Sequence, residues 1–200
     1  MKKLFSFLLL LSFTIKAQEI KIGNQTWTTK NLDVTTYRNG DAIPQVQDKK
    51  AWANLITGAW CYHENKAANG TIYGKLYNWY AVNDPRGLAP KGYHIPKDAE
   101  WNILTDYLGG ETVAGIKMKS TSGWDDNGNG TNPRGFAGLP GGSRYYTGNF
   151  NDIGAYGYWW SSSEINIISV WCRYLNYYVG NVYSYSYFKN YGFSVRCLRD

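Results

Sequence analysis

The sequence predicts an α+β fold, and three observations lead to this prediction. Helical periodicity is confined to residues 73–120, whereas short strand-like runs separated by turns fill residues 121–200. Tyr, Trp and Gly are abundant (18, 9 and 22 residues), and charged residues make up only 18% of the chain, a composition typical of loop-rich β structure. The length of 200 residues is that of about one domain, and neither a repeat nor a linker divides it.

Residues 1–17 have the pattern of a secretory signal peptide. The chain starts with the basic sequence MKK, an apolar run covers residues 4–13, and Ala17 is a suitable cleavage residue. The run is too short to span a bilayer, and no cysteine directly follows it to carry a lipid. We therefore expect an exported protein (periplasmic, cell-surface or secreted) without a transmembrane anchor, folded as a single domain over residues 18–200.

The charge of the chain gives no indication of nucleic acid binding. The net charge is +6, and removal of Lys2, Lys3 and Lys16 with the signal peptide leaves +3. The chain has no basic run of the kind that follows a phosphate backbone. We therefore expect no nucleic acid partner.

The first predicted elements of the mature chain are two β-hairpins. The segment EIKIGNQTWTTKNL alternates apolar and polar residues around a Gly23-Asn24 turn. The segment YRNGDAIPQV contains a second turn signal, Asn39-Gly40.

Helices are predicted next. The segment YGKLYNWYAVND (73–84) has apolar residues on one helical face, and PKDAEWNILTDYLGG (96–110) repeats them at i, i+3 and i+7 from Trp101. Gly109 ends this second helix, as a left-handed C-terminal cap requires. The segment VAGIKMKS (113–120) predicts a short third helix.

Strands are predicted after residue 121. A stretch rich in turn residues, SGWDDNGNGTNPRGF, precedes four strand-like segments: FAGLPGGSRYY, YGYWWSSSE, VWCRYLNY and YGFSVRCLRD. In the last of these, Phe193, Val195 and Cys197 share one face, so we expect a buried closing strand.

Six segments occur in an order that resembles the Fibrobacter succinogenes major paralogous domain, a family of exported bacterial proteins. They are GNQTWTTKNLD, YGKLYNWYAV, APKGYHIPKDAEWNILTDYLGG, GFAGLPGG, YWWSSSE and GFSVRCLRD, and the resemblance runs from about Ile20 to Asp200. The family in turn resembles the C-type-lectin-like fold, which formylglycine-generating enzymes also use. The resemblance implies two helices flanking a twisted antiparallel sheet, with the N- and C-terminal strands paired.

The chain departs from the family pattern at three positions. Ala89 stands where members often have Cys, and Tyr93 stands where they have Trp. Members usually begin the second helix with Ser or Thr three residues before Glu. Here Lys97 precedes Glu100, so we expect the capping box to be lost at a cost of about 0.5–2 kcal/mol.

Three cysteines remain in the chain, namely Cys61, Cys172 and Cys197. In an oxidising compartment two of them could pair and leave one free, and the sequence allows all three pairings. No C-x-x-C motif and no zinc-type Cys/His spacing occurs.

We expect a binding protein and assign no catalytic residue. The two late cysteines do not stand in the context of formylglycine-type active sites, and the chain lacks the Glu-Pro-Asn, Gln-Pro-Asp and Trp-Asn-Asp triplets of calcium-dependent lectins. His94 in GYHIP is interpreted as a packing residue. The Ser161–Ser163 run has no base in its local sequence and follows two tryptophans at an expected strand end.

One turn has a weak resemblance to a calcium loop. Asp125, Asn127 and Asn129 alternate before Gly130, but Phe136 occupies position twelve, where an acidic ligand is required. A polar turn is the favoured interpretation, and a calcium site completed by distant residues is the alternative.

Residues 165–191 differ chemically from the rest of the chain. They include no Asp, Glu, Gln or Met, and nearly every residue is one that an AAC codon can yield when its two adenines are replaced. This pattern resembles the variable proteins of diversity-generating retroelements. Under this interpretation the fixed positions are Trp171, Arg173, Leu175, Gly180, Val182 and Lys189. The predicted variable, ligand-binding positions are Asn166, Ile167, Ile168, Ser169, Cys172, Tyr174, Tyr178, Val179, Tyr183, Ser184, Tyr185, Ser186, Tyr187, Phe188, Asn190 and Tyr191.

The same segment has the amino-acid alphabet of antibody paratopes, in which Tyr supplies rigid contact area and Ser, Asn and Gly supply hydrogen bonds. We therefore expect an exported recognition module whose partner is a protein or glycan on a cell, phage or host surface. Alternating Tyr and Ser also suits an edge strand or a buried hairpin. The alternatives are an enzyme or calcium-dependent lectin of the same fold, and a structural cell-surface protein. The sequence leaves the oligomeric state open.

Overall fold

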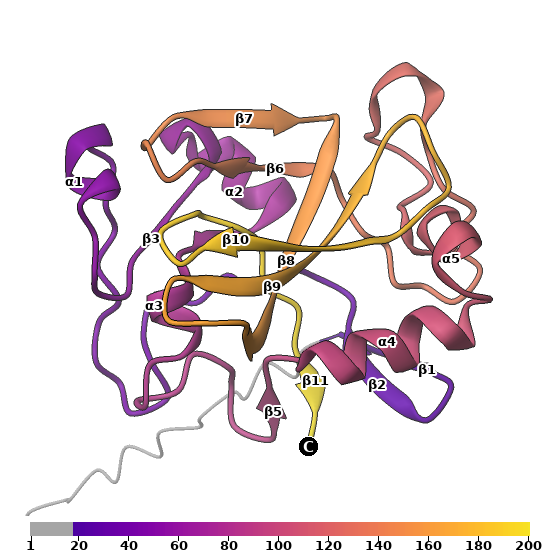
Figure 1. Ribbon diagram of the computed structural model, residues 1–200, viewed down its shortest axis with the longest axis horizontal. Helices are drawn as coiled ribbons and strands as arrows, with labels where there is room; N and C mark the ends of the chain where they lie inside the picture. Colours follow the sequence, from indigo (N-terminus) through magenta and orange to yellow (C-terminus); the bar gives the residue numbers. More distant parts are fainter. Residues whose placement is uncertain (1–17) are drawn as a thin grey trace, which may run out of the picture.

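The computed structural model describes residues 18–200, and the predicted signal peptide lies outside them. Within this range the α+β prediction is confirmed, because short helices surround sheets that are antiparallel except for one β6–β8 pairing (Figure 1). No helix among these residues has the length and apolarity needed to cross a bilayer.

The elements have the following bounds. The helices are α1 (Lys49–Ala53), α2 (Ala67–Tyr73), α3 (Trp79–Val82), α4 (Asp98–Tyr107) and α5 (Glu111–Met118), with 3-10 turns η1 (His63–Asn65) and η2 (Asp125–Asn127). The strands are β1 (Glu19–Ile22), β2 (Gln25–Thr28), β3 (Trp60–Cys61), β4 (Leu76–Tyr77), β5 (Tyr93–His94), β6 (Gly141–Arg144), β7 (Phe150–Ile153), β8 (Tyr156–Glu164), β9 (Ser169–Asn176), β10 (Tyr183–Phe188) and β11 (Leu198–Arg199).

The largest sheet has the strand order β10-β9-β8-β6-β7, and it separates two hydrophobic clusters. Neighbouring residues of β8 point to opposite faces, as the twofold period of a strand requires. Trp160 therefore lies in one cluster with Cys172, and Trp159 lies in the other with Leu175. Both sides of this sheet are covered in its interior, and β10 is left as an edge strand (Figure 1).

A second sheet joins the two ends of the described chain. Its order is β1-β2-β11-β5, and Leu198 pairs with Trp27 on one side and with His94 on the other. The predicted β1–β2 hairpin and the implied pairing of terminal strands are both present. The second predicted hairpin is reduced to one bridge between Thr36 and Ala42.

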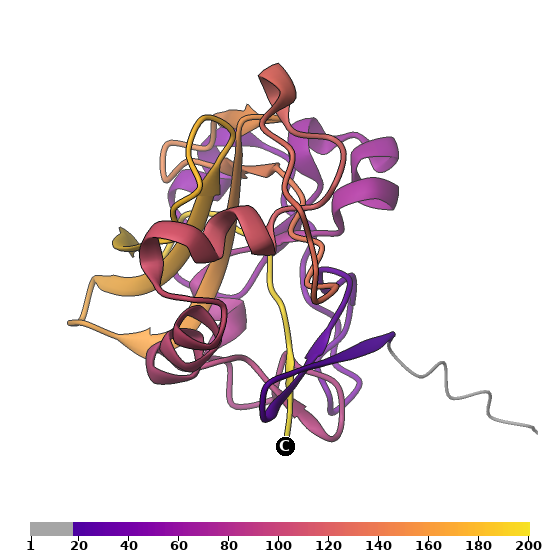
Figure 2. The same cartoon turned by 90° about the vertical axis from the view of Figure 1, so that its right-hand side faces the viewer.

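The closing segment, residues 191–198, is buried along its whole length. Phe193, Val195 and Cys197 enter one cluster together, as their spacing predicts. The predicted continuous strand is nevertheless wrong, because only Leu198–Arg199 forms a ladder and the preceding residues make isolated bridges to different partners. Figures 1 and 2 show this segment descending to the C-terminus as extended chain beside the β1–β2 hairpin.

Arg196 fastens the closing segment to the N-terminal half of the domain. Its guanidinium is fully buried and donates to the carbonyl oxygens of Thr28 (2.9 Å), Phe136 (2.7 Å) and Ala137 (3.0 Å). Its Nε donates to Asn31 Oδ1 at 2.7 Å. We call this group the Arg196 clasp.

Asn31 extends the clasp to the central sheet. Its Oδ1 also accepts a hydrogen bond from Trp159 Nε1 at 2.9 Å, and its Nδ2 donates to the carbonyl oxygen of Tyr73 at 2.8 Å and to Ser194 Oγ at 3.1 Å. One amide side chain thus satisfies polar groups from three segments, namely α2, β8 and the closing segment.

The helix predictions are confirmed for α4 and α5 but wrong for residues 73–84. Leu76–Tyr77 form β4 against β3, and only the turn Trp79–Val82 is helical. The error has a physical cause: this stretch is buried on several sides, so its apolar spacing does not describe a single helical face. Asn78 ends the strand and begins the helix, because its Oδ1 accepts from Ala81 N and from Ala59 N.

The capping box of α4 is half retained, which corrects the expected loss. Glu100 Oε2 accepts from Lys97 N at 2.8 Å, although the lysine side chain has no acceptor atom to offer in return. The hydroxyl of Ser163 on β8 accepts from Asp98 N at 3.0 Å and supplies a cap from a distant strand.

We predict that Asn31→Ala lowers the free energy of unfolding by about 3 kcal/mol, because it leaves buried donors of Arg196 and Trp159 without an acceptor. Urea unfolding measures this change. Asn54→Ala, at the exposed end of α1, is the matched control and should cost less than about 1 kcal/mol. Equal effects of the two substitutions would contradict the role of the clasp.

Candidate functional site

The segment predicted to bind ligand forms β9, β10 and the loops beside them, at the exposed edge of the largest sheet (Figure 1). Three features of the fold decide which of its side chains can meet a ligand: the alternation of β10, the packing of aromatic rings, and the turn at residues 165–168.

The alternation of Tyr and Ser in β10 sorts the two residue types onto opposite faces. Tyr183, Tyr185 and Tyr187 stand opposite Tyr174, Cys172 and Val170 of β9. Ser184 points the other way, and its Oγ accepts a hydrogen bond from Arg173 Nη1 at 2.6 Å. Ser184 therefore binds Arg173 of β9 and lies on the face of the sheet opposite the tyrosines.

The tyrosines of β8, β9 and β10 pack into one surface that we call the tyrosine face, made of Tyr156, Tyr158, Tyr174, Tyr183, Tyr185 and Tyr187. Tyr174 and Tyr183 are stacked, with ring centroids 4.8 Å apart and planes 13° apart. Tyr158 contacts Tyr174 at 5.7 Å, and Tyr187 contacts both Tyr158 and Tyr185. Contacts of this kind fix each ring. Tyr158 is buried beneath the others and supports them, and the other five rings are at least partly exposed.

Exposure separates the residues that can touch a ligand from those beneath them. Tyr185 and Tyr178 are 58% and 60% exposed, whereas Cys172 is 0% and Tyr191 is 9% exposed. Burial raises the pKa of Tyr191 to about 12, and its ring packs against Phe193. Cys172 and Tyr191, both predicted as ligand-binding, thus lie below the surface and do not contact a ligand docked on it.

A second exposed group, the isoleucine patch, consists of Ile56, Ile167, Ile168 and Phe188. Ile167 is 86% and Ile56 is 79% exposed. These four residues line a pocket of about 460 Å³ between the 165–168 turn and the chain after α1. Contiguous exposed apolar side chains of this kind are typical of interaction sites.

The remaining predicted positions hold the local backbone or border the surface. Asn166 Oδ1 accepts from Ile168 N and Ser169 N and so shapes the turn. Asn190 Nδ2 donates to the carbonyl oxygens of Ala53 and Tyr146. Half-buried positions at the same edge are Ser169, Val179 and Ser186.

Tertiary structure adds residues that the sequence did not place in the site. Tyr156 stacks on Tyr158 at 5.7 Å, and Tyr146 meets Phe188 edge-on at 5.6 Å. Asp152 of β7 accepts a hydrogen bond from the Tyr158 hydroxyl at 3.2 Å. These residues lie outside the chemically distinct segment, so composition alone gave no signal for them.

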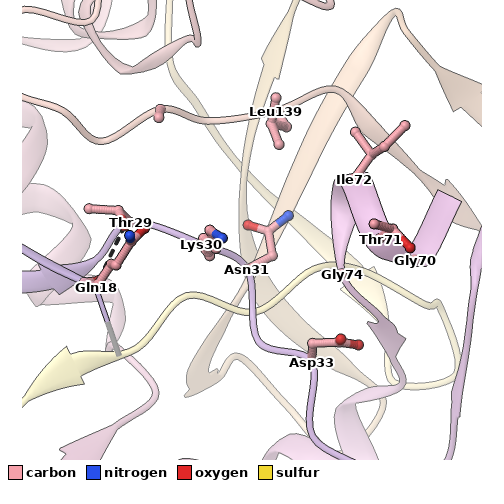
Figure 3. A pocket seen from close by; sticks show the side chains of 11 residues that line it. Gln18, Thr29, Lys30, Asn31, Asp33, Gly70, Thr71, Ile72, Gly74 and Leu139 are labelled. Atoms are coloured by element: carbon pink, nitrogen blue, oxygen red, sulfur yellow. Dashed lines mark hydrogen bonds between the residues drawn. The ribbon is translucent and has the colours of Figure 1, made fainter. Parts of the chain in front are cut away.

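Another pocket lies elsewhere, between the chain after β2 and helix α2 (Figure 3). It has a volume of about 530 Å³, and Lys30, Asn31 and Thr71 are among its lining residues. The Asn31 side chain is already occupied by the clasp. None of the predicted ligand-binding residues lines this pocket, so we assign no role to it.

The weak calcium candidates form a compact turn. Asp125 and Asn127 belong to η2, and Asn129 Oδ1 accepts from Trp124 N at 3.1 Å. Residues 18–200 hold no group of three or more His, Cys, Asp and Glu side chains placed to bind a metal ion. The calcium site stays a prediction.

The serines and His94 that an enzymatic interpretation would use are engaged in structural hydrogen bonds. Ser162 Oγ donates to the carbonyl oxygen of Ile95, and Ser161 Oγ accepts from Ser163 N. His94 lies between two carboxylates, with Nδ1 2.8 Å from Asp200 and Nε2 3.0 Å from Glu100. This arrangement agrees with its interpretation as a hydrogen-bonded packing residue.

All three cysteines are free and buried, so none of the three pairings that the sequence allows is present. Burial raises the pKa of Cys61 and of Cys197 to about 12, and raises that of Cys172 further. The thiols are therefore protonated at neutral pH and poor nucleophiles.

The comparisons with known proteins identify the family. The family model of the Fibrobacter succinogenes major domain matches residues 20–199, and the chain belongs to this family. No curated protein and no solved structure matches the chain.

We predict that native protein reacts with iodoacetamide at none of its three cysteines within the time in which the unfolded protein reacts at all three. The reason is that burial both blocks access and keeps the thiols protonated. Mass spectrometry of intact protein counts the labels. A mass lower by two hydrogens, or fast labelling of the native protein at mildly alkaline pH, would contradict the buried free thiols.

Proposed function

We propose that this member of the Fibrobacter succinogenes major domain family is an exported recognition protein that binds a protein or glycan on another surface. The tyrosine face and the isoleucine patch are the binding surface. The observation that supports this most strongly is a continuous set of mutually packed tyrosines that leaves Tyr185 and Tyr178 more than half exposed.

Rigid aromatic rings suit recognition because a tyrosine loses little conformational entropy on binding and offers an apolar ring with a polar hydroxyl. Ring–ring contacts already restrict Tyr174, Tyr183 and Tyr187 before any ligand arrives. A preorganised surface retains more of its contact energy as affinity.

We also propose that the fold is C-type-lectin-like and that its exposed edge is diversified by a retroelement. Burial supports the second proposal in part: three of the six predicted fixed residues (Arg173, Leu175 and Val182) are buried, whereas 14 of the 16 predicted variable positions are at least partly exposed. The buried Cys172 and Tyr191 are exceptions and limit which residues those two positions tolerate.

The loop between β9 and β10 is fastened through its main chain. Ile116 N donates to the carbonyl oxygen of Gly180, and Val182 N donates to that of Glu111. Lys119 Nζ adds a bond to the carbonyl oxygen of Val179 at 3.1 Å. Main-chain anchors do not depend on side-chain identity, so this loop can change sequence without losing its position.

We predict that Tyr185→Ala removes binding and leaves the fold intact, because its ring is exposed and touches only Tyr187 among the described aromatics. The binding readout is a displayed random-peptide library together with a glycan array, both selected first on the unmodified protein. Thermal unfolding should change little, by less than about 1 kcal/mol.

Tyr187→Ala serves as the contrasting variant. This ring packs on Tyr158, Tyr191 and Phe193, so its loss should destabilise the protein by about 2–4 kcal/mol. If Tyr185→Ala binds every selected ligand as well as the unmodified protein does, the tyrosine face is not the binding surface.

The gene tests diversification separately. We predict a near-identical template repeat close to the gene, which differs from the codons for residues 165–191 only at adenines, and a reverse transcriptase beside it. Sequencing of the flanking DNA decides the matter, and codons that trace to no such template would contradict the proposal.

A further inference from the structure

The carboxylate of Asp152 lies beside the tyrosine face. Asp152 of β7 is half-buried, and its Oδ2 accepts hydrogen bonds from Tyr158 at 3.2 Å and more weakly from Ser143 at 3.5 Å. No cationic side chain of residues 18–200 forms a salt bridge with it. The pKa values of Tyr145 and Tyr158 are both raised, mainly by burial and next by the negative charge of Asp152.

Three cations of the surrounding sheet, on β6, on β9 and directly after β10, have other partners. Arg173 pairs with Asp98 on the opposite face of the sheet, and Lys189 pairs with Glu164. Arg144 follows Ser143 directly, but its guanidinium donates to main-chain oxygens of residues 46–48 and 148. The Asp152 carboxylate thus lies beside the aromatic surface without a salt-bridge partner among the described residues.

We propose that the partly exposed rings of Tyr145 and Tyr156 bind a cationic side chain, the guanidinium or ammonium group of an Arg or Lys on a protein partner, with Asp152 as its counter-charge. This inference rests on the proposed function and names the partner chemistry. A cation is attracted to the negative face of an aromatic ring, and a neighbouring carboxylate adds direct Coulomb attraction. A neutral glycan would leave the carboxylate uncompensated.

The protein already uses the same combination internally. The guanidinium of Arg86 lies 4.1 Å from the ring centroid of Tyr37 while its Nε donates to Asp84 at 2.8 Å. Lys75 likewise pairs with Asp33 while it lies over the rings of Trp60 and Tyr62. Around Asp152 the rings and the carboxylate are present, and the cation is the component that a partner would supply.

Asp152→Asn is the decisive variant, because asparagine keeps the shape and the acceptor oxygen and removes the charge. Asp152 has a positive φ of 68°, a conformation that Asn tolerates well. Asp126→Asn is the matched control, since Asp126 is exposed, also has a positive φ (46°), and lies in η2.

The experiment selects peptides from a displayed random library on the unmodified protein and keeps those whose binding is lost in Tyr185→Ala or Tyr156→Ala. The expected result is enrichment of Arg and Lys in these peptides, and affinity about ten-fold lower for Asp152→Asn but unchanged for Asp126→Asn. High salt should weaken binding to the unmodified protein more than binding to Asp152→Asn.

The outcomes separate the two proposals. Peptides that depend on the tyrosines but show no basic enrichment and bind Asp152→Asn normally would overturn the cation inference and leave the proposed function standing. The absence of any tyrosine-dependent peptide, with binding of neutral glycans instead, would overturn the protein-partner class.

A second measurement does not depend on the folding of a variant. Protein with labelled tyrosine rings is titrated with Nα-acetylated arginine amide and with Nα-acetylated citrulline amide, its neutral isostere, and the ring resonances are followed by NMR. Shifts at Tyr145 and Tyr156 with the arginine compound alone support the inference. Equal shifts with both compounds, or none with either, would overturn it.

Discussion

The buried guanidinium of Arg196 is the interaction on which the rest of the structure depends. It binds oxygens from β2, from the chain before β6 and from Asn31, and Asn31 in turn holds Trp159 of the central sheet. Burial lowers the pKa of Arg196, because a charge inside the protein has no water to solvate it. Four short hydrogen bonds to oxygen offset that cost and place the closing segment between the two hydrophobic clusters.

The Arg196 clasp and the pairing of β2 with β11 stabilise the interior of the domain. The edge strand β10 takes no part in either interaction. Arg173 fixes β9 from below through Asp98, Asn102 and Ser184, so the anchor lies on the face opposite the tyrosines. The tyrosines above it stabilise one another, and only their outer sides remain unpartnered. The residues that stabilise these two strands thus differ from those that we propose to bind a ligand.

The sequence predicted what depends on local patterns and missed what depends on tertiary contacts. The α4 periodicity, the β1–β2 turn and the alternation of the last residues are local signals, and each corresponds to an observed feature. The helix predicted over residues 73–84 was wrong because Leu76 and Tyr77 pair with β3 and with Phe193, which come from distant parts of the chain. The distinctive composition marked the segment that we propose to bind ligand, but Asp152, Tyr156 and Ile56 join it only through folding. The buried position of Cys172 likewise follows from strand register, which no composition reveals.

The central claim is that the exposed edge is separable from the scaffold, and paired libraries test it most directly. One library randomises Ile167, Tyr178, Tyr183 and Tyr185 together, and the other randomises Cys172, Tyr187, Tyr191 and Phe193. Protease resistance of each displayed library measures the fraction of folded variants. The account predicts that most members of the first library stay folded and that most members of the second do not. Equal folded fractions in the two libraries would contradict it.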